Sequence, residues 1–172
     1  MRHANRKSTP KVRNGRVQRK NRTTLSPDFR NYPQGSLTID RQRPGDGCRH
    51  LLHKADIERF IEIIPDWSEL STGLEAIVLA PGTDDCMGWH TTGIVAVCAW
   101  ERDVAGHWYN VFVDEHRDVL ERLNVRVERA DADTYWVDWD EPSAAAFQLM
   151  HVFLHELGHH HDRITTQSQK RA

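Results

Sequence analysis

The chain has 172 residues and a formal net charge of −2, which suits one folded domain with a tail. No apolar run reaches the roughly 18 residues of a membrane-spanning helix, which argues against an integral membrane protein. The three cysteines include no Cys-x-x-Cys pair, and the N-terminus lacks the apolar core of a secretion signal, so we expect free thiols in a cytoplasmic protein.

Charge is distributed unevenly along the chain. Residues 1–24 hold nine Lys or Arg residues and no Asp or Glu, which leaves 14 basic against 25 acidic residues in the rest. Residues 1–35 are also interrupted by proline and glycine, and we expect a disordered basic tail. Such a tail is either simply solvated or contacts nucleic acid or an acidic partner. The folded domain is expected over 36–172, beginning between Leu37 and Cys48.

Hydrophobic periodicity predicts the elements of the first half of this domain. Apolar residues at helical spacing predict a helix over 55–64, which Pro65 ends. A short apolar run predicts a strand over 75–80. Turn-forming residues predict a loop over 81–92, and a β-branched run predicts a second strand over 93–100.

The second half continues the mixture of helices and strands. An apolar stripe predicts a helix over 104–123, and alternation predicts strands over 125–129 and 134–139, paired as a hairpin. A last helix is expected from 142 to about 163, capped by Asp140 or Ser143. The predicted fold is therefore α+β, with a small twisted mixed or antiparallel sheet and three main helices.

The last helix carries the sequence His155-Glu156-Leu157-Gly158-His159. Residues four apart share one face of a helix, so His155 and His159 can reach one metal ion. Zinc accepts imidazole nitrogen and lowers the pKa of a water molecule, and Glu156 can take its proton. The alternative is a histidine-rich helix end exposed to water, which does not explain why these residues fall in register within an apolar helix.

This His-Glu-x-x-His pattern resembles the zincin metallopeptidases. The resemblance implies a Zn²⁺ site with His155 and His159 as ligands and Glu156 as the general base that acts on a peptide or protein substrate. It also implies a twisted sheet beside the motif helix, with strand 93–100 as the edge strand that aligns an extended substrate.

The third metal ligand is not fixed by the sequence. Zincins with a glutamate ligand carry it after the motif, whereas the ten residues after Asp162 include no Asp, Glu, His or Cys. Asp162, His90 and His116 are the candidates within the chain. The run 151–163 and the segments 65–67 and 77–82 also resemble uncharacterised bacterial proteins in which a following acidic segment could supply the ligand. That resemblance implies a shortened member or a site completed differently.

The motif helix is expected to present two faces. One is a polar stripe along a cleft, and the opposite face is buried; His160 and His161 are expected to be solvated. The stripe comprises Gln148, His151, His155, His159 and Asp162, and the buried face comprises Ala146, Leu149, Met150, Phe153 and Leu157. Two functions follow: a zinc-dependent metallopeptidase, or a catalytically inactive zincin-like metal-binding regulator or interaction module. A third possibility is a nucleic-acid-associated protein that acts through its basic tail.

Overall fold

The computed structural model describes residues 12–13, 16–17, 36–82 and 86–169, and they form an α+β fold, as the sequence predicts. In the predicted disordered tail, β1 (Val12–Arg13) pairs antiparallel with β2 (Arg16–Val17). The rest of the tail prediction lies outside the described residues. No helix in the described part of the chain is long and apolar enough to cross a membrane.

The main sheet has four strands in the order β3-β5-β7-β6. The first three strands run parallel, and β6 pairs antiparallel with β7 at one edge. Every residue of β5 and β7 is buried, as is typical of central strands covered on both faces. The four strands are β3 (Thr38–Arg41), β5 (Ala76–Ala80), β7 (Ile94–Cys98) and β6 (Gly88–Thr91).

This arrangement corrects two predictions from the sequence. The expected edge strand, 93–100, corresponds to β7 and the short β8 (Trp100–Glu101), and β7 lies between β5 and β6. The edge strand is β6, which lies within the predicted loop 81–92. Four residues next to turn formers give too little alternation to reveal a strand, whereas pairing with β7 fixes it. β8 pairs with β4 (Cys48–Arg49).

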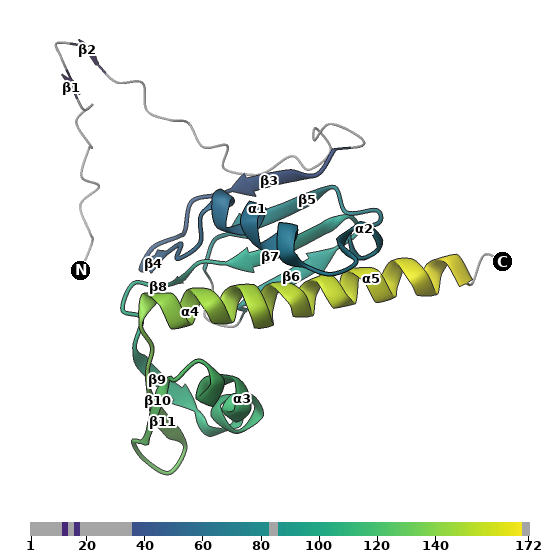
Figure 1. Ribbon diagram of the computed structural model, residues 1–172. Helices are drawn as coiled ribbons and strands as arrows, with labels where there is room; N and C mark the ends of the chain where they lie inside the picture. The colour runs from purple at the N-terminus through teal and green to yellow at the C-terminus, as the bar shows by residue number, and fades with distance from the viewer. Residues whose placement is uncertain (1–11, 14–15, 18–35, 83–85, 170–172) are drawn as a thin grey trace, which may run out of the picture.

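Helices cover one face of the main sheet (Figure 1). They are α1 (Lys54–Ile63), the one-turn α2 (Trp67–Leu70) and a long helix at the end of the chain. That long helix is continuous, as predicted, but contains a π-helical turn. Its parts are α4 (Glu141–Phe147), η2 (Gln148–Phe153) and α5 (Leu154–Gln169).

The N-terminus of the long helix is capped as the sequence predicts. The Asp140 carboxylate accepts a hydrogen bond from the Ser143 backbone N–H at 2.8 Å, and the Ser143 hydroxyl accepts one from the Asp140 N–H at 3.1 Å. Pro142 lies in the first turn, where the missing N–H costs nothing. These local interactions fix where the helix starts.

A smaller unit packs beside the long helix (Figure 1). Its antiparallel sheet has the order β10-β11-β9, and β10 and β11 form the predicted hairpin. The predicted helix 104–123 is wrong at its start, because 106–109 forms β9 and pairs with β11. This tertiary pairing overrides the helical spacing of Trp108 and Phe112. The elements are β9 (Gly106–Tyr109), α3 (Asn110–Arg122), β10 (Arg126–Arg129) and β11 (Thr134–Asp138).

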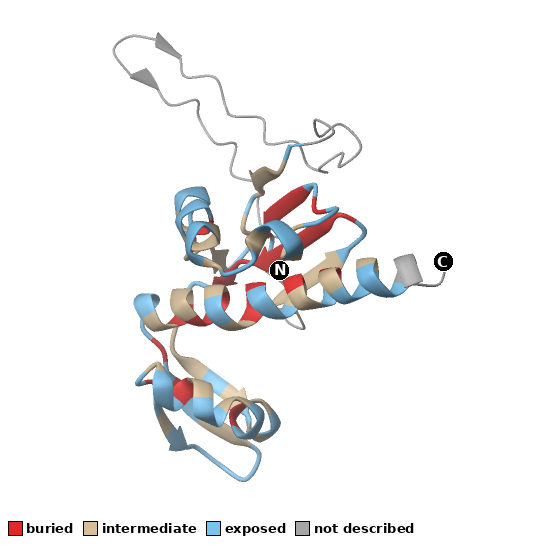
Figure 2. Ribbon diagram, turned by 45° about the vertical axis from the view of Figure 1, so that its right-hand side comes forward, coloured by how far each residue is buried: buried red, intermediate tan, exposed pale blue. Residues whose placement is uncertain are grey.

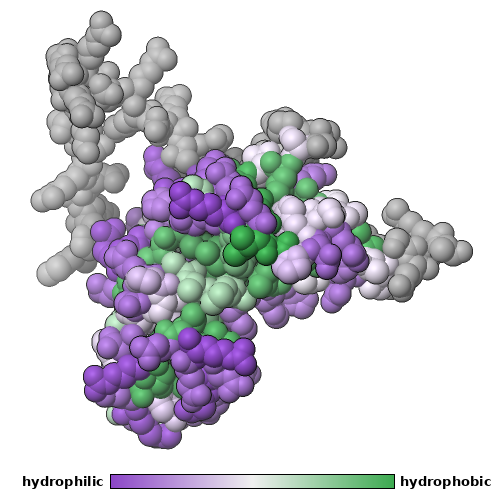
Figure 3. Space-filling view, in the orientation of Figure 1, coloured by the Kyte–Doolittle hydropathy of each residue, from purple (hydrophilic) through white to green (hydrophobic). Residues whose placement is uncertain are grey.

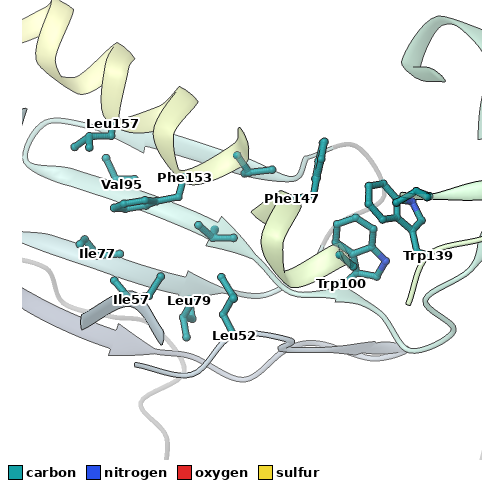
Figure 4. Close-up of a cluster of buried hydrophobic side chains, with 14 of the residues drawn as sticks. Leu52, Ile57, Ile77, Leu79, Val95, Trp100, Trp139, Phe147, Phe153 and Leu157 are labelled. Atoms are coloured by element: carbon teal, nitrogen blue, oxygen red, sulfur yellow. The ribbon is translucent and has the colours of Figure 1, made fainter. Parts of the chain in front are cut away.

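The main core lies between the long helix and the sheet (Figures 2 and 4). Phe153 and Leu157 are almost fully buried and point toward Val95 on β7. Where the sheet meets the smaller unit, the rings of Trp100 and Trp139 pack with centroids 5.3 Å apart. This packing fixes the long helix against the sheet and therefore determines where the motif residues lie.

Candidate metal centre

The two motif histidines converge at the surface of α5. Both are exposed, and the Nε2 atoms of His155 and His159 lie 3.0 Å apart. Their ring centroids are 4.5 Å apart, with the rings nearly perpendicular. Two nitrogens bound to one tetrahedral zinc ion at about 2.0–2.1 Å lie roughly 3.3 Å from each other. The pair therefore fits two of the ligands of such an ion.

Glu156 lies beside this pair, against the edge strand β6. Its side chain is 12% exposed, and its Oε2 accepts a hydrogen bond from Nδ1 of His90 at 2.9 Å. A carboxylate removed from water needs such a partner, since a buried unpaired charge is costly. In this bond the Nδ1–H of His90 donates to the carboxylate.

Gly88 allows α5 and β6 to approach this closely. A Cβ atom at Gly88 would lie 2.6 Å from Cγ1 of Val152 and 3.0 Å from Cγ of Glu156. Both contacts come from the long helix, and the backbone oxygen of Ala96 would be 3.0 Å away on the other side. Any side chain here would push the helix and the strand apart and move Glu156 relative to His90.

His90 is the third-ligand candidate that the fold brings next to the pair. Its ring stacks on that of His159, with centroids 5.0 Å apart and planes 21° from parallel. Among the described residues, however, no group of three or more His, Cys, Asp or Glu is arranged to hold a metal ion together. The structure thus supplies a two-histidine pair with His90 beside it.

The other two candidates for the third ligand are His116 on α3 and Asp162 on α5. His116 donates from Nδ1 to the carbonyl of Phe112 at 2.7 Å, and its ring packs against His151 rather than against the motif pair. Asp162 is exposed on α5, three residues after His159. His151 itself contacts His155, with ring centroids 6.3 Å apart. Its pKa is lowered by burial first, and then by the nearby His116 and His155.

The prediction that His160 is solvated is wrong. His160 is 1% exposed, and its Nε2 donates to the carbonyl of Thr72 at 3.0 Å, which ties α5 to the segment after α2. Burial lowers its pKa, although the bond to Thr72 acts in the opposite direction. The sequence contains a pattern that indicates this burial, because Phe153, Leu157 and His160 are spaced so that they share one face of a helix.

The predicted faces of the motif helix are also partly wrong. Gln148, expected on the polar stripe, is buried, and its Nε2 donates to the carbonyl of Cys98 at 2.7 Å. Met150, expected to be buried, is 51% exposed. Both residues lie in η2, and a π-helical turn takes more residues than an α-helical turn, so a stripe extrapolated back from His155 loses register there.

Comparisons with protein-family models, with curated proteins and with solved structures found no match. The interpretation of the site therefore depends on the geometry of this chain.

Proposed function

We propose that the protein is a cytoplasmic, zinc-dependent metallopeptidase-like hydrolase that cleaves peptide bonds. The observation that carries this proposal is the convergence of His155 and His159 at 3.0 Å, with Glu156 beside them, on a helix that lies along an antiparallel edge strand. The three cysteines are all free thiols, which supports a reducing compartment.

Each motif residue has a distinct role in this proposal. His155 and His159 would hold a zinc ion through their converging Nε2 atoms. When bound, zinc would act as a Lewis acid that lowers the pKa of a water molecule and polarises a carbonyl group. Glu156 accepts a proton on its carboxylate and passes it to the leaving amine. The N–H of His90 holds that carboxylate in one orientation while it does so.

The candidates for the third ligand of the proposed site are His90, Asp162, His116 and a group outside this chain. His90 is the candidate that the geometry favours, because its ring stacks on that of His159 and its Nδ1 is bonded to the Glu156 carboxylate. A histidine whose other nitrogen is bonded to a carboxylate is the usual form of a zinc ligand.

The edge strand suggests how a substrate is held. In the described part of the chain, β6 lies at one edge of the main sheet and pairs with β7. An extended peptide can pair there as an additional strand, as in many peptide-binding proteins. In this proposal, a peptide or protein substrate lies alongside His90 and Glu156.

A second function is favoured by a specific observation. Glu156 is already engaged by His90, and a complete three-ligand set is not found among the residues that the structure describes. These facts suit a zincin-like metal-binding regulator or interaction module without turnover. Such a regulator would bind zinc through the same two histidines as the peptidase, but it would not hydrolyse peptides.

Zinc titration of the purified, metal-free chain tests the site. We expect one zinc ion per chain, and no zinc binding when His155 and His159 are both replaced by Ala. His161→Ala is the matched control, because it removes a neighbouring imidazole outside the pair. Zinc should also raise the thermal midpoint of the wild type and leave that of the double variant unchanged. Full zinc content in the double variant would show that the metal binds elsewhere.

A peptide-library assay of the zinc-loaded protein then separates the two functions. Hydrolysis that depends on zinc supports the peptidase. Stoichiometric zinc binding with no hydrolysis of any library member supports the regulator.

A further inference from the structure

A cavity of about 400 Å³ lies between the end of β7 and the smaller unit. It is separate from the candidate metal centre, because neither His155 nor His159 is among the described residues that line it. Its wall is built from β8, β9, the first turn of α3 and the π-helical turn η2, together with the ends of β6 and β7. The volume is within the range of cavities that bind small molecules.

Aromatic side chains form much of the wall, and they are held in place by one another. They are Trp100 on β8, Trp108 and Tyr109 on β9, and Phe112 on α3. The ring of Trp108 lies 5.7 Å from that of Trp100 and 4.4 Å from that of Phe112, measured between centroids. The indole N–H of Trp100 donates to the carbonyl of Val104 at 3.4 Å. Rings fixed before a ligand enters lower the entropic cost of binding.

The polar side chains of the lining favour a positively charged ligand. Among the described residues, the lining includes the carboxylate of Glu101 and no Lys or Arg. Glu101 is exposed and forms no ion pair with any residue that the structure describes. Gln148 is 3% exposed, and its N–H bond to the Cys98 carbonyl leaves the amide oxygen as an acceptor. The imidazole of the lining, His107, packs edge-on against Trp136, with ring centroids 5.2 Å apart.

A carboxylate beside aromatic rings distinguishes between classes of ligand. The face of an aromatic ring carries partial negative charge, and ammonium groups are commonly recognised by sets of such rings. An anionic ligand would be repelled by Glu101, and a neutral apolar ligand would gain nothing from it. A cation attached to an apolar body gains from the carboxylate and from the rings together.

We propose that this cavity binds an organic cation, in which an ammonium group is attached to an apolar body. The ammonium group lies beside Glu101, and the apolar body lies against the rings of Trp108 and Phe112. The inference goes beyond the proposed function, since it requires neither zinc nor a peptide substrate.

Calorimetric titration of the full chain with three ligands of similar size tests the proposal. The probes are 2-phenylethylammonium, 2-phenylethanol and 3-phenylpropionate, which attach a positive, a neutral and a negative group to a phenyl ring. We expect the cation to bind about tenfold tighter than the alcohol, because it adds an ion pair and a cation–π interaction, and the anion to bind most weakly. The titrations are run at pH 8, where exposed imidazoles are largely neutral.

Substitutions in the lining locate the preference in the cavity. Glu101→Gln keeps the size of the side chain and removes its charge, so it should weaken binding of the cation by about threefold to fivefold and leave that of the alcohol unchanged. Glu115→Gln, at an exposed position of α3 outside the lining, is the matched control and should change neither affinity.

Tyr109 allows a test of the aromatic wall without disturbing the core, because it is 74% exposed. Tyr109→Ala should weaken binding of the cation, and Tyr109→Phe, which keeps the ring, should retain it. Circular dichroism and the thermal midpoint check that both variants fold.

The outcomes separate this inference from the proposed function. Amines can also bind zinc, so the titration is repeated with the His155→Ala, His159→Ala double variant, in which the preference for the cation should persist. Loss of the preference there would place the ligand at the histidine pair and overturn the cavity. Absence of binding, tightest binding of the anion, or a preference unchanged by Glu101→Gln would overturn the organic cation as its occupant. A preference for the cation that Glu101→Gln reduces, in a protein that binds no zinc and hydrolyses no peptide, would support the cavity and count against the proposed function.

Discussion

Glu156 is the residue on which the proposed chemistry depends most. Its carboxylate is 12% exposed, lies beside the two converging histidines and accepts a hydrogen bond from the His90 ring. The charged group is therefore held in one orientation. In the proposed site, Glu156 lies next to the histidine pair and is not itself a ligand, so proton transfer and metal binding would depend on different residues. This separation can be tested by one substitution.

Glu156→Gln should abolish most hydrolysis and leave zinc binding intact. The amide oxygen of Gln can still accept the hydrogen bond from His90, but the side chain can no longer take a proton. Loss of a general base lowers the rate by about 10²–10⁴-fold. The rate is measured on the best library peptide, and zinc content by elemental analysis. Undiminished hydrolysis by this variant would exclude Glu156 as the base.

Cys98 should resist alkylation in the folded protein. Burial raises its pKa to about 12, so the thiol stays protonated at every pH up to about 10, and the thiolate is the reactive form. Iodoacetamide at pH 8 should modify Cys98 far more slowly than after unfolding in guanidinium chloride, as followed by peptide mass spectrometry. Equal rates in the two states would show that Cys98 is accessible and ionised.

Two elements, α5 and β6, have to meet for the site to form. The residues that approach from the helix side are Val152 and Glu156, and the strand meets them with a glycine. Some large apolar side chains of α1 and of the long helix are exposed, namely Ile63, Met150 and Leu154. Figure 3 shows apolar side chains in a band between α1 and the long helix. Close packing of Gly88 against Val152 and Glu156 determines how near α5 lies to β6.

Gly88→Ala should destabilise the fold by roughly 1–3 kcal/mol, because the added methyl group overlaps Val152 and the Ala96 carbonyl. Gly158→Ala is the matched control. A Cβ atom there meets nothing within 4 Å, and Ala favours a helix over Gly by up to about 1 kcal/mol. Urea unfolding measures both changes. Equal stability of Gly88→Ala and the wild type would show that the helix and the strand can separate without cost.

At the scale of the whole molecule, charge divides the chain into two parts. Nine basic residues lie within 1–24, and the rest of the chain is acidic. A basic tail on an acidic domain suggests that the tail and the domain have separate functions. The two alternatives for the tail are that it binds nucleic acid and that it is only solvated. The smaller unit packs beside the long helix (Figure 1). Side chains of this unit and of the segment after β7, among them Trp108 and Trp100, line a cavity of about 400 Å³.

If the tail binds nucleic acid, binding should weaken steeply with salt. Displacement of six to ten phosphate counterions lowers affinity by about 10³–10⁵-fold between roughly 50 and 200 mM salt. Fluorescence anisotropy with a labelled double-stranded oligonucleotide measures this dependence. Replacement of the nine Lys and Arg residues of 1–24 by Gln should remove the binding. Affinity that does not change with salt would contradict an electrostatic role, and absence of binding would favour the solvated tail.

The sequence by itself determined the features that depend on local geometry. Helical spacing placed His155 and His159 on one face, and the measured 3.0 Å between their Nε2 atoms follows from that spacing. The same holds for α1, for the cap of the long helix at Asp140 and for the hairpin of β10 and β11. In each case the interacting residues are close in the sequence.

Only the tertiary structure decided the contacts between distant residues. His90 meets Glu156 across 66 positions of the chain, and this depends on β6 pairing with β7 and on a glycine at the contact. The burial of Gln148 and the exposure of Met150 depend on the π-helical turn, whose register a regular helical period does not reveal. Long-range pairing is set by the packing of whole elements, so spacing along one element could not predict it.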